Sequence, residues 1–180
     1  LLSLSSHKVY GPKGVGALHV REGKNVAPII TGGSQEFGLR ASTPNVAGIV
    51  GFTKALELSD KTREKEYKKT EELREFFWQE IERVIPSAVR NTPDHAKALP
   101  HVLNVTFPGV SNIVALFDTH GVAVSSGAAC STRAGTAPYV LTAMGVSVED
   151  AKSSVRFSLG KETTKEELKE AVKRIKKAVS

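Results

Sequence analysis

An apolar stripe with helical spacing follows residue 60 and limits the folds that this chain can adopt. Within Lys61–Ile85 the large apolar residues recur on one side of a helix, while most charged residues fall elsewhere. The stripe consists of Leu73, Phe76, Phe77, Ile81, Val84 and Ile85. Pro86 ends the pattern, because proline lacks the backbone donor that a helix interior needs. We therefore predict a long amphipathic helix that packs against a second layer of structure.

Strand and helix patterns alternate after this helix. Val102–Phe107 and Ser154–Leu159 alternate with the period of a strand, which places Arg156 on the face opposite Phe157. Thr164 begins a capping box for a last amphipathic helix. Shorter helices are expected at 111–119, 138–144 and 147–152, and a short strand at 122–125. The order of elements predicts an α/β fold of modest size without an internal repeat.

The first 60 residues carry a different pattern. Leu1–Ser5 and Val15–Val20 read as short strands on either side of a glycine-rich turn. Thr43 before Pro44 is typical of a helix N-terminus, and the apolar residues that follow predict a buried helix to about Ser59. We therefore predict two domains, residues 1–60 and residues 61–180, with the helix at 61–85 as the bridge between them.

The charge composition does not favour nucleic-acid or membrane binding. The 180 residues include 25 Lys and Arg against 19 Asp and Glu, a net charge of +6. Much of this charge is mixed in sign along helical segments, as on a solvated face, and no array of aromatic residues could stack on bases. No apolar stretch reaches the ~18 residues of a membrane-spanning helix. We predict no nucleic-acid and no membrane partner, and keep nucleic-acid binding as a distant alternative.

Cys130 is the one cysteine of the chain. A single thiol excludes an intramolecular disulfide and a multi-cysteine metal site, and we predict no metal ligands. It fits a reducing compartment, hence a cytoplasmic location, or an organelle in a eukaryote. A lone cysteine is more often an inert core residue. The small and polar neighbours of Cys130 favour an exposed thiol instead, and Arg133 would favour its thiolate, so Cys130 is a candidate nucleophile.

Two basic residues occupy positions where strands often present functional groups. Lys8 follows the first strand and precedes the turn Gly11–Gly16, which matches neither a Walker A loop nor a dinucleotide-binding fingerprint. The alternative is an ordinary surface lysine. Arg156 is either a solvated charge or a bidentate partner for a carboxylate. The residues alone do not decide between a functional and an ordinary surface role for either Lys8 or Arg156.

Four segments of the chain resemble, in the same order, the signature motifs of the cysteine desulfurases, which are class V, fold-type I pyridoxal-phosphate enzymes. They are the lysine motif Ser5–Leu18, the second signature Gly32–Glu36 with Leu39, Arg40 and Thr43, the cysteine loop Ser125–Ser131 and the substrate-arginine strand Val155–Gly160. Some positions depart from the family pattern, among them Pro44 and Asn45. Ser42 stands where a glycine is usual, and Ala128 replaces a serine, a feature also compatible with selenocysteine lyases.

The resemblance implies a cofactor site at the matched positions. Lys8 would hold pyridoxal 5′-phosphate as an internal Schiff base and then move a proton on the substrate. Ser5 and His7 would bind the cofactor phosphate. Thr43 would reach the phosphate of the partner subunit's cofactor, which requires a homodimer.

The resemblance also implies the reaction. Arg156 would pair with the carboxylate of L-cysteine, and Cys130 would attack the substrate sulfur, leaving L-alanine and a persulfide. The sulfur would then pass to an acceptor or scaffold protein for iron–sulfur cluster or thio-cofactor assembly. Two alternatives remain, a selenocysteine lyase and a non-enzymatic fragment that serves as a dimerisation or persulfide-accepting module.

The resemblance further implies a longer parent protein. The family's cofactor-stacking histidine, its aspartate at the pyridinium nitrogen and its glutamine at the phenolic oxygen precede the lysine motif, and they have no counterpart in this chain. We therefore expect the C-terminal half of such an enzyme, which by itself would bind the cofactor poorly and be inactive. Residues 1–60 would complete the large cofactor-binding domain, and residues 61–180 would form the small C-terminal domain.

Overall fold

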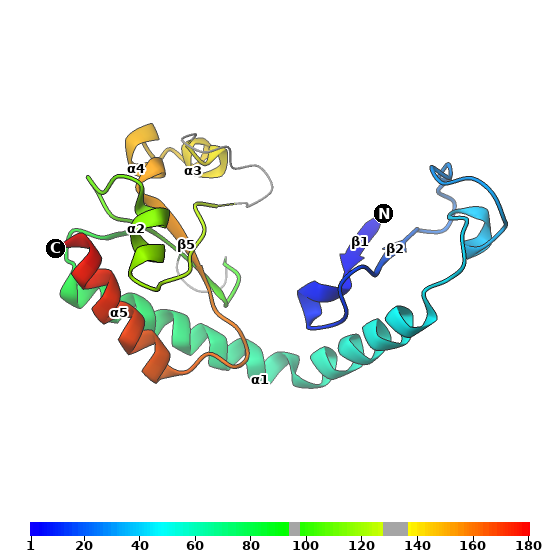
Figure 1. Ribbon diagram of the computed structural model, residues 1–180, viewed down its shortest axis with the longest axis horizontal. Coiled ribbons are helices and arrows are strands. Elements are labelled where there is room, and N and C mark those ends of the chain that lie inside the picture. Colours follow the sequence, from blue (N-terminus) through cyan, green and yellow to red (C-terminus); the bar gives the residue numbers. More distant parts are fainter. Residues whose placement is uncertain (94–97, 128–136) are drawn as a thin grey trace. The chain divides into compact units, whose positions relative to one another are not determined.

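The computed structural model describes residues 1–93, 98–127 and 137–180 (Figure 1). The chain divides into two compact units, Leu1–Glu64 and Lys65–Ser180, and each is described by itself below. The helix α1 (Val46–Val84) begins in the first unit and ends in the second. That the two units are parts of a large and a small domain stays a prediction.

The first unit is built on a two-stranded antiparallel ribbon. Strand β1 (Leu2–Ser5) pairs with β2 (Gly16–His19), with Leu2 opposite His19 and Ser5 opposite Gly16. The short 3₁₀ helix η1 (Ser6–Val9) follows β1 directly, and a second one, η2 (Glu36–Gly38), lies in the loop before α1. Both strands lie within the ranges that the sequence pattern predicted.

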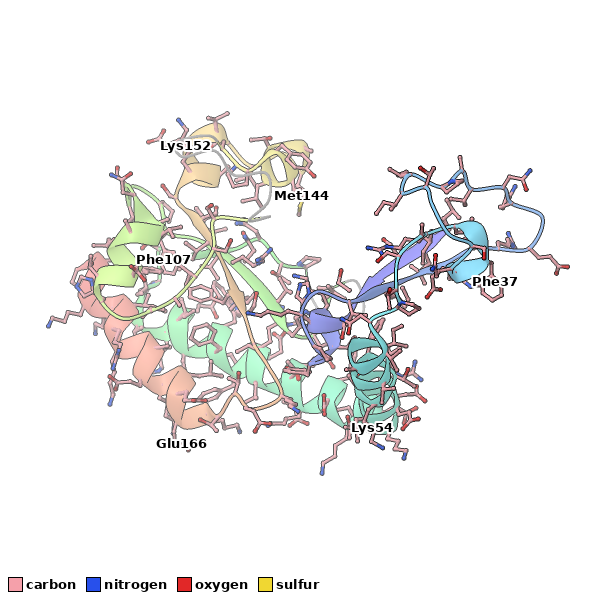
Figure 2. The ribbon with its side chains drawn as sticks, turned by 45° about the vertical axis from the view of Figure 1, so that its right-hand side comes forward. Phe37, Lys54, Phe107, Met144, Lys152 and Glu166 are labelled. Carbon is pink, nitrogen blue, oxygen red and sulfur yellow. The ribbon has the colours of Figure 1, made fainter. Side chains whose placement is uncertain are left out.

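Large apolar side chains of the first unit remain exposed. All residues of both strands are exposed, and Ile29 and Phe37 have exposed fractions of 96% and 99%. Figure 2 labels Phe37, which lies in η2. Buried apolar residues are few in this unit and include Phe52 and Ala55 on α1. Because a two-stranded ribbon is marginal in water without a covering layer, the described residues alone give the first unit little hydrophobic stabilisation.

Helix α1 corrects two details of the sequence-based expectation. A helix ending near Ser59 and a second one from Lys61 were predicted, but one continuous helix of 39 residues covers both segments. The sequence between them contains neither glycine nor proline, so nothing breaks the hydrogen-bond ladder. The helix also begins after Asn45, whose Oδ1 accepts a hydrogen bond of 3.1 Å from the Gly48 amide. Asn45 and not Thr43 therefore caps the helix.

The second unit contains a three-stranded antiparallel sheet in the order β3 (Val89–Arg90), β4 (Val102–Thr106) and β5 (Ser154–Ser158). The short strand β3 was not expected. Besides the second half of α1, the described residues of this unit form helices close to the predicted ranges: α2 (Ile113–Thr119), α3 (Tyr139–Ala143), α4 (Val148–Lys152) and α5 (Lys165–Val179). The expected strand at 122–125 is reduced to a single bridge between Ser125 and Arg156.

One face of this sheet carries the hydrophobic core. Helices α1, α2 and α5 contribute Phe77, Phe117 and Val172, respectively, to the same buried cluster as the apolar residues of β4 and β5. Edge-to-face contacts join Phe77 to Phe157 at 5.0 Å and Phe107 to Phe117 at 5.3 Å between ring centroids. Such aromatic pairs stabilise a core beyond the area that they bury. Thr164 and Glu167 form the predicted capping box of α5.

A buried ion-pair network ties α1 to the segments around β3. The side chain of Arg74 is fully buried, and its guanidinium lies 2.9 Å from a Glu75 carboxylate oxygen and donates a 2.8 Å hydrogen bond to the Leu99 carbonyl. The same carboxylate receives two hydrogen bonds, of 2.7 and 2.8 Å, from Arg90. The hydrogen bonds from Arg90 lower the pKa of Glu75 below its ordinary value, with a further contribution from Arg74.

We predict that Glu75→Gln lowers the free energy of unfolding by about 2 kcal/mol, because it removes the carboxylate shared by Arg74 and Arg90 and leaves the buried Arg74 only the more distant Glu71, at 3.8 Å. Denaturant unfolding followed by the fluorescence of Trp78 measures this loss. The exposed neighbour Glu72 is the matched control, and Glu72→Gln should change stability by no more than about 0.5 kcal/mol. Equal losses in both variants would contradict the assigned role of the network.

The same network predicts a pH dependence of stability. Because the pKa of Glu75 is lowered in the folded state, its contribution is complete above the unfolded-state pKa and is lost as the pH falls through the lowered folded-state pKa. The stability difference between the wild type and Glu75→Gln should therefore shrink on acidification, and the same fluorescence measurement at several pH values checks this. A difference that stays constant across that range would be inconsistent with an ionised Glu75.

Candidate functional site

Three of the predicted site residues lie within four consecutive positions of the first unit. Ser5 ends β1, and His7 and Lys8 lie in η1. The residue between them, Ser6, is fully buried, while Ser5, His7 and Lys8 are exposed. The segment therefore presents a hydroxyl, an imidazole and an amine together on an accessible surface.

Local packing fixes this segment. The Ser6 amide donates to the Val15 carbonyl at 3.1 Å, and the Gly11 amide donates to the Ser6 carbonyl at 3.0 Å. A β-carbon at Gly11 would collide with Ser6 Oγ, so the turn requires glycine at this position. Tyr10 closes η1 in the left-handed conformation with φ 61°, which a residue with a large side chain rarely adopts. This combination holds Ser6 inward and leaves Lys8 outward.

Thr43 belongs to the same unit and lies between Ala41 and the start of α1. Thr43 is exposed, and the residue before it, Ser42, has a φ of 107°. Ser42 donates its amide to Gln35 Oε1 at 3.3 Å, which links the threonine segment to the η2 loop. The predicted reach of Thr43 to a partner subunit's cofactor stays a prediction.

Arg156 lies in the second unit, on the face of β5 that is opposite the core. The antiparallel register places it directly across from Asn104 of β4. On its other side Arg156 exchanges two backbone hydrogen bonds with Ser125, of 2.6 and 3.2 Å. Its Nε atom is buried and has no hydrogen-bond partner among the residues that the structure describes. A buried N–H without an acceptor is costly, so this edge of the guanidinium is suited to receive an anionic oxygen.

A network of neutral polar side chains lies beside Arg156 on the same face. Asn91 donates from Nδ2 to Asn104 Oδ1 and to Thr106 Oγ1, both at 2.8 Å, and the hydroxyls of Thr106 and Ser154 are 2.7 Å apart. The sequence analysis did not single out these residues. The alternation that predicted the apolar face also places Asn104, Thr106 and Ser154 on the opposite face, and this signal could have identified them.

His101 is a second residue that the sequence analysis missed. It immediately precedes β4, and its carbonyl accepts a 2.8 Å hydrogen bond from the Leu159 amide. Burial lowers the pKa of His101 below its ordinary value, and the positive charge of Arg156 lowers it further. The neutral form of the imidazole is therefore favoured beside the Arg156 guanidinium.

The predicted nucleophile, Cys130, lies outside the described residues, and its role stays a prediction. The segments on either side of it are defined, since Ser125 is bridged to Arg156 and Tyr139 begins α3. Lys8 belongs to the first unit and Arg156 to the second. The structure therefore describes the surroundings of Lys8 within the first unit and those of Arg156 within the second.

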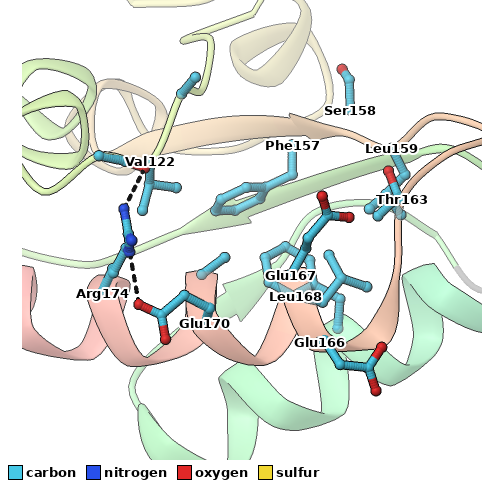
Figure 3. A pocket seen from close by; sticks show the side chains of 14 residues that line it. Val122, Phe157, Ser158, Leu159, Thr163, Glu166, Glu167, Leu168, Glu170 and Arg174 are labelled. Carbon is cyan, nitrogen blue, oxygen red and sulfur yellow. Dashed lines mark hydrogen bonds and ion pairs between the residues drawn. The ribbon is translucent and has the colours of Figure 1, made fainter.

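A hollow of about 700 Å³ lies elsewhere in the second unit, between β5, α5 and the segment at 121–123 (Figure 3). Phe157 and Leu168 contribute apolar surface, and Glu166, Glu167 and Glu170 line it with carboxylates. Arg174 donates to Glu170 at 3.0 Å and to the Gly121 carbonyl at 3.3 Å, so its charge is already engaged. None of the five predicted site residues that the structure describes lines this hollow, and its carboxylates disfavour an anionic substrate.

With the fold and these positions defined, comparison with known proteins identifies the class. The family model described as aminotransferase class-V matches residues 1–170. The chain therefore belongs to the aminotransferase class-V family. The fold predicted from the sequence is confirmed, because the α/β structure resembles solved NifS-like proteins throughout its length.

Relatives within this family include proteins named cysteine desulfurase IscS. The protein of that name from Dictyoglomus turgidum is 46% identical over 170 residues, which are 93% of this chain and 43% of the relative. A Clostridium botulinum protein of the same name is 42% identical over 171 residues, again 93% of this chain and 43% of the relative. The chain therefore spans less than half the length of these relatives, and the predicted resemblance to cysteine desulfurases is confirmed.

Two solved structures show the same relationship. A NifS-like protein superimposes with a TM-score of 0.85 at 36% identity, covering 97% of this chain and 45% of that one. The NifS-like protein from Rickettsia africae superimposes with a TM-score of 0.84 at 29% identity, covering 98% of this chain and 46% of that one.

Over the described parts of the chain, no helix is both long and apolar enough to cross a membrane.

The strained backbone at Ser42 yields a prediction about the threonine segment. We expect Ser42→Gly to stabilise the local structure by about 1 kcal/mol, because glycine adopts positive φ without the steric cost that serine bears. Amide hydrogen exchange in residues 35–43 should slow by about fivefold. Ser3→Gly, in the strand β1, is the control and should accelerate exchange in its own segment. Faster exchange at 35–43 in Ser42→Gly would refute the assignment of strain.

Proposed function

We propose that the full protein to which this chain belongs is a cysteine desulfurase that converts L-cysteine to L-alanine and transfers the sulfur to Cys130. The observation that carries this proposal is the buried Nε of Arg156, which lacks an acceptor among the described residues. The carboxylate of an amino-acid substrate supplies that acceptor. The names of the relatives and the thiol of Cys130 support cysteine as the amino acid.

The donor set of the lysine segment fits pyridoxal 5′-phosphate. This cofactor requires an amine for its aldehyde and several hydrogen-bond donors for its phosphate. Lys8 offers the amine, and the exposed Ser5 and His7 offer donors within three positions of it. Thr43 of the partner subunit would add a hydroxyl, which makes the proposed enzyme a homodimer. When bound, the cofactor supplies the electron sink for the charge that develops at the substrate Cα.

The chain's own residues would divide the remaining work. The Lys8 amine takes the proton from the substrate Cα, and Arg156 orients the substrate through its carboxylate. The Cys130 thiolate attacks the substrate sulfur, so that a sulfur–sulfur bond forms as the carbon–sulfur bond breaks. The electron pair of the broken bond stays with carbon, which becomes the methyl group of alanine after protonation. The enzyme is left with a persulfide on Cys130.

A persulfide is useful only if an acceptor takes its sulfur. We therefore propose that a sulfur-acceptor or iron–sulfur scaffold protein is the macromolecular partner, and that the reaction takes place in a reducing compartment such as the cytoplasm, where the thiol of Cys130 persists.

A chimera tests the proposed activity. This chain would replace the matching segment of the Dictyoglomus turgidum relative, so that the missing portion comes from a protein 46% identical over the replaced region. We expect alanine and sulfide to form from L-cysteine in the presence of a thiol reductant. Lys8→Ala should abolish the cofactor's visible absorption and lower turnover at least 10³-fold. Cys130→Ser should retain the absorption and lose sulfide formation to a similar extent.

Matched controls separate the proposal from its alternatives. Lys13→Ala removes an exposed lysine from the turn that follows η1 and should leave absorption and turnover unchanged. A strong preference for selenocysteine over cysteine would identify a selenocysteine lyase instead. A colourless chimera whose Cys130 reacts with alkylating agents, but which forms no alanine, would contradict the proposed enzyme and favour a persulfide-accepting module.

A further inference from the structure

A row of polar residues crosses the sheet of the second unit at the level of Arg156. The register places Arg90 opposite Val105, so the next residue, Asn91, lies opposite Asn104, and its amide donates to the Asn104 carbonyl at 2.9 Å. Asn104 in turn lies opposite Arg156. Asn104 therefore stands between Asn91 and the arginine, and directly opposed cross-strand residues have Cβ atoms about 4.5–5.5 Å apart.

The polar groups of Asn104 are held from the side of Asn91. Its backbone amide donates to Thr92 Oγ1 at 2.7 Å, and its side-chain Oδ1 accepts from Asn91 Nδ2 at 2.8 Å. Asn91 is itself held by Thr106. Because Oδ1 is committed to Asn91, the end of the Asn104 amide left for a ligand is its NH₂ group.

This geometry leaves two sets of donors side by side. The Arg156 Nε–H is buried without an acceptor among the described residues, and the Asn104 NH₂ group belongs to the neighbouring side chain on the same face. A carboxylate has two oxygens and about four acceptor positions, so it can satisfy an arginine and an amide together. Packing alone does not explain why the Asn104 side-chain amide is oriented by a hydrogen bond from Asn91. An apolar side chain at position 104 would fill the same space and would need no such hydrogen bond.

We propose that Asn104 binds the substrate carboxylate together with Arg156, and that Asn91 is the positioning residue that turns the Asn104 amide toward it. This inference rests on the proposed function for the identity of the substrate. It adds a specificity-determining donor on β4 to the arginine on β5. The subsite selects for a carboxylate rather than for the thiol or the amine of the substrate.

Kinetics of the chimera give the first test. Asn104→Ala should raise the KM for L-cysteine about three- to tenfold, the loss of roughly one hydrogen bond, and leave kcat within about twofold. Asn104→Asp should raise KM further, because it places a negative charge beside the substrate carboxylate. Asn91→Ala should show a smaller rise in KM. Asn25→Ala makes the same chemical change at an exposed position outside the row and should leave both constants unchanged.

A carboxylate-free ligand separates substrate recognition from a structural role. Cysteamine has the amine and thiol of cysteine without its carboxylate, so its binding, followed by the change in cofactor absorption, should be equal in the wild type and in Asn104→Ala. Equal weakening toward cysteamine and L-cysteine would overturn the proposal, because it would indicate a general disturbance of the sheet.

Side-chain NMR signals test the subsite without catalysis. On titration of the 180-residue chain with L-alanine, the Asn104 NH₂ and Arg156 Nε–H resonances should shift together, and ethylamine, which lacks a carboxylate, should shift neither. If Arg156 responds and Asn104 does not, the inference fails while the proposed function stands. If both respond but the chimera forms no alanine from L-cysteine, the subsite stands and the proposed function fails. If neither responds, the inference is overturned.

Discussion

The antiparallel register between β4 and β5 is the constraint on which the second unit depends. Leu103 opposite Phe157 and Asn104 opposite Arg156 are successive pairs of the same ladder, so one face of the sheet is apolar and the other polar. The apolar face gains its stability from burial against α1, α2 and α5. The polar face can then hold a charged side chain close to the core. A shift of one residue would exchange the two faces and destroy both the core and the arginine site.

The first unit follows a different principle, because it presents Lys8 by local geometry and not by a deep core. Three features shape the segment around η1: the side chain of Ser6 is buried, Gly11 leaves no room for a β-carbon beside the Ser6 hydroxyl, and Tyr10 has a left-handed backbone. Strained backbone of this kind persists only where surrounding contacts enforce it, and it is common around functional groups. The exposed apolar residues of the ribbon show that the described residues of this chain cover only part of the apolar surface of this unit.

The aminotransferase class-V match over residues 1–170 includes both the lysine segment of the first unit and the arginine strand of the second. The lysine segment and the arginine strand lie in different units, and the chain spans less than half of the relatives it matches. The proposed chemistry needs an amine, a cofactor phosphate site and a carboxylate receptor, and the candidate residues for them come from both units. Each of the candidate groups, Lys8, Cys130 and Arg156, can be tested by itself.

The sequence by itself determined the features that depend on neighbouring residues. The apolar stripe of α1, the Thr164 capping box and the two faces of β5 follow from helical and strand periodicity, and the order of the motifs indicated the family. The position of the α1 cap was wrong, because Thr43 and Asn45 are both good capping residues and local sequence does not choose between them.

Only the tertiary structure decided which distant residues meet. Strand β3 has two residues and therefore no measurable periodicity, so its pairing with β4 could not be predicted. The row from Asn91 through Asn104 to Arg156 depends on that pairing and on the register of β5. Register is set by side-chain packing between segments far apart in the chain, and no local pattern encodes the partner of a given residue. The sequence therefore singled out Arg156 as a candidate, and the strand register placed Asn104 opposite it.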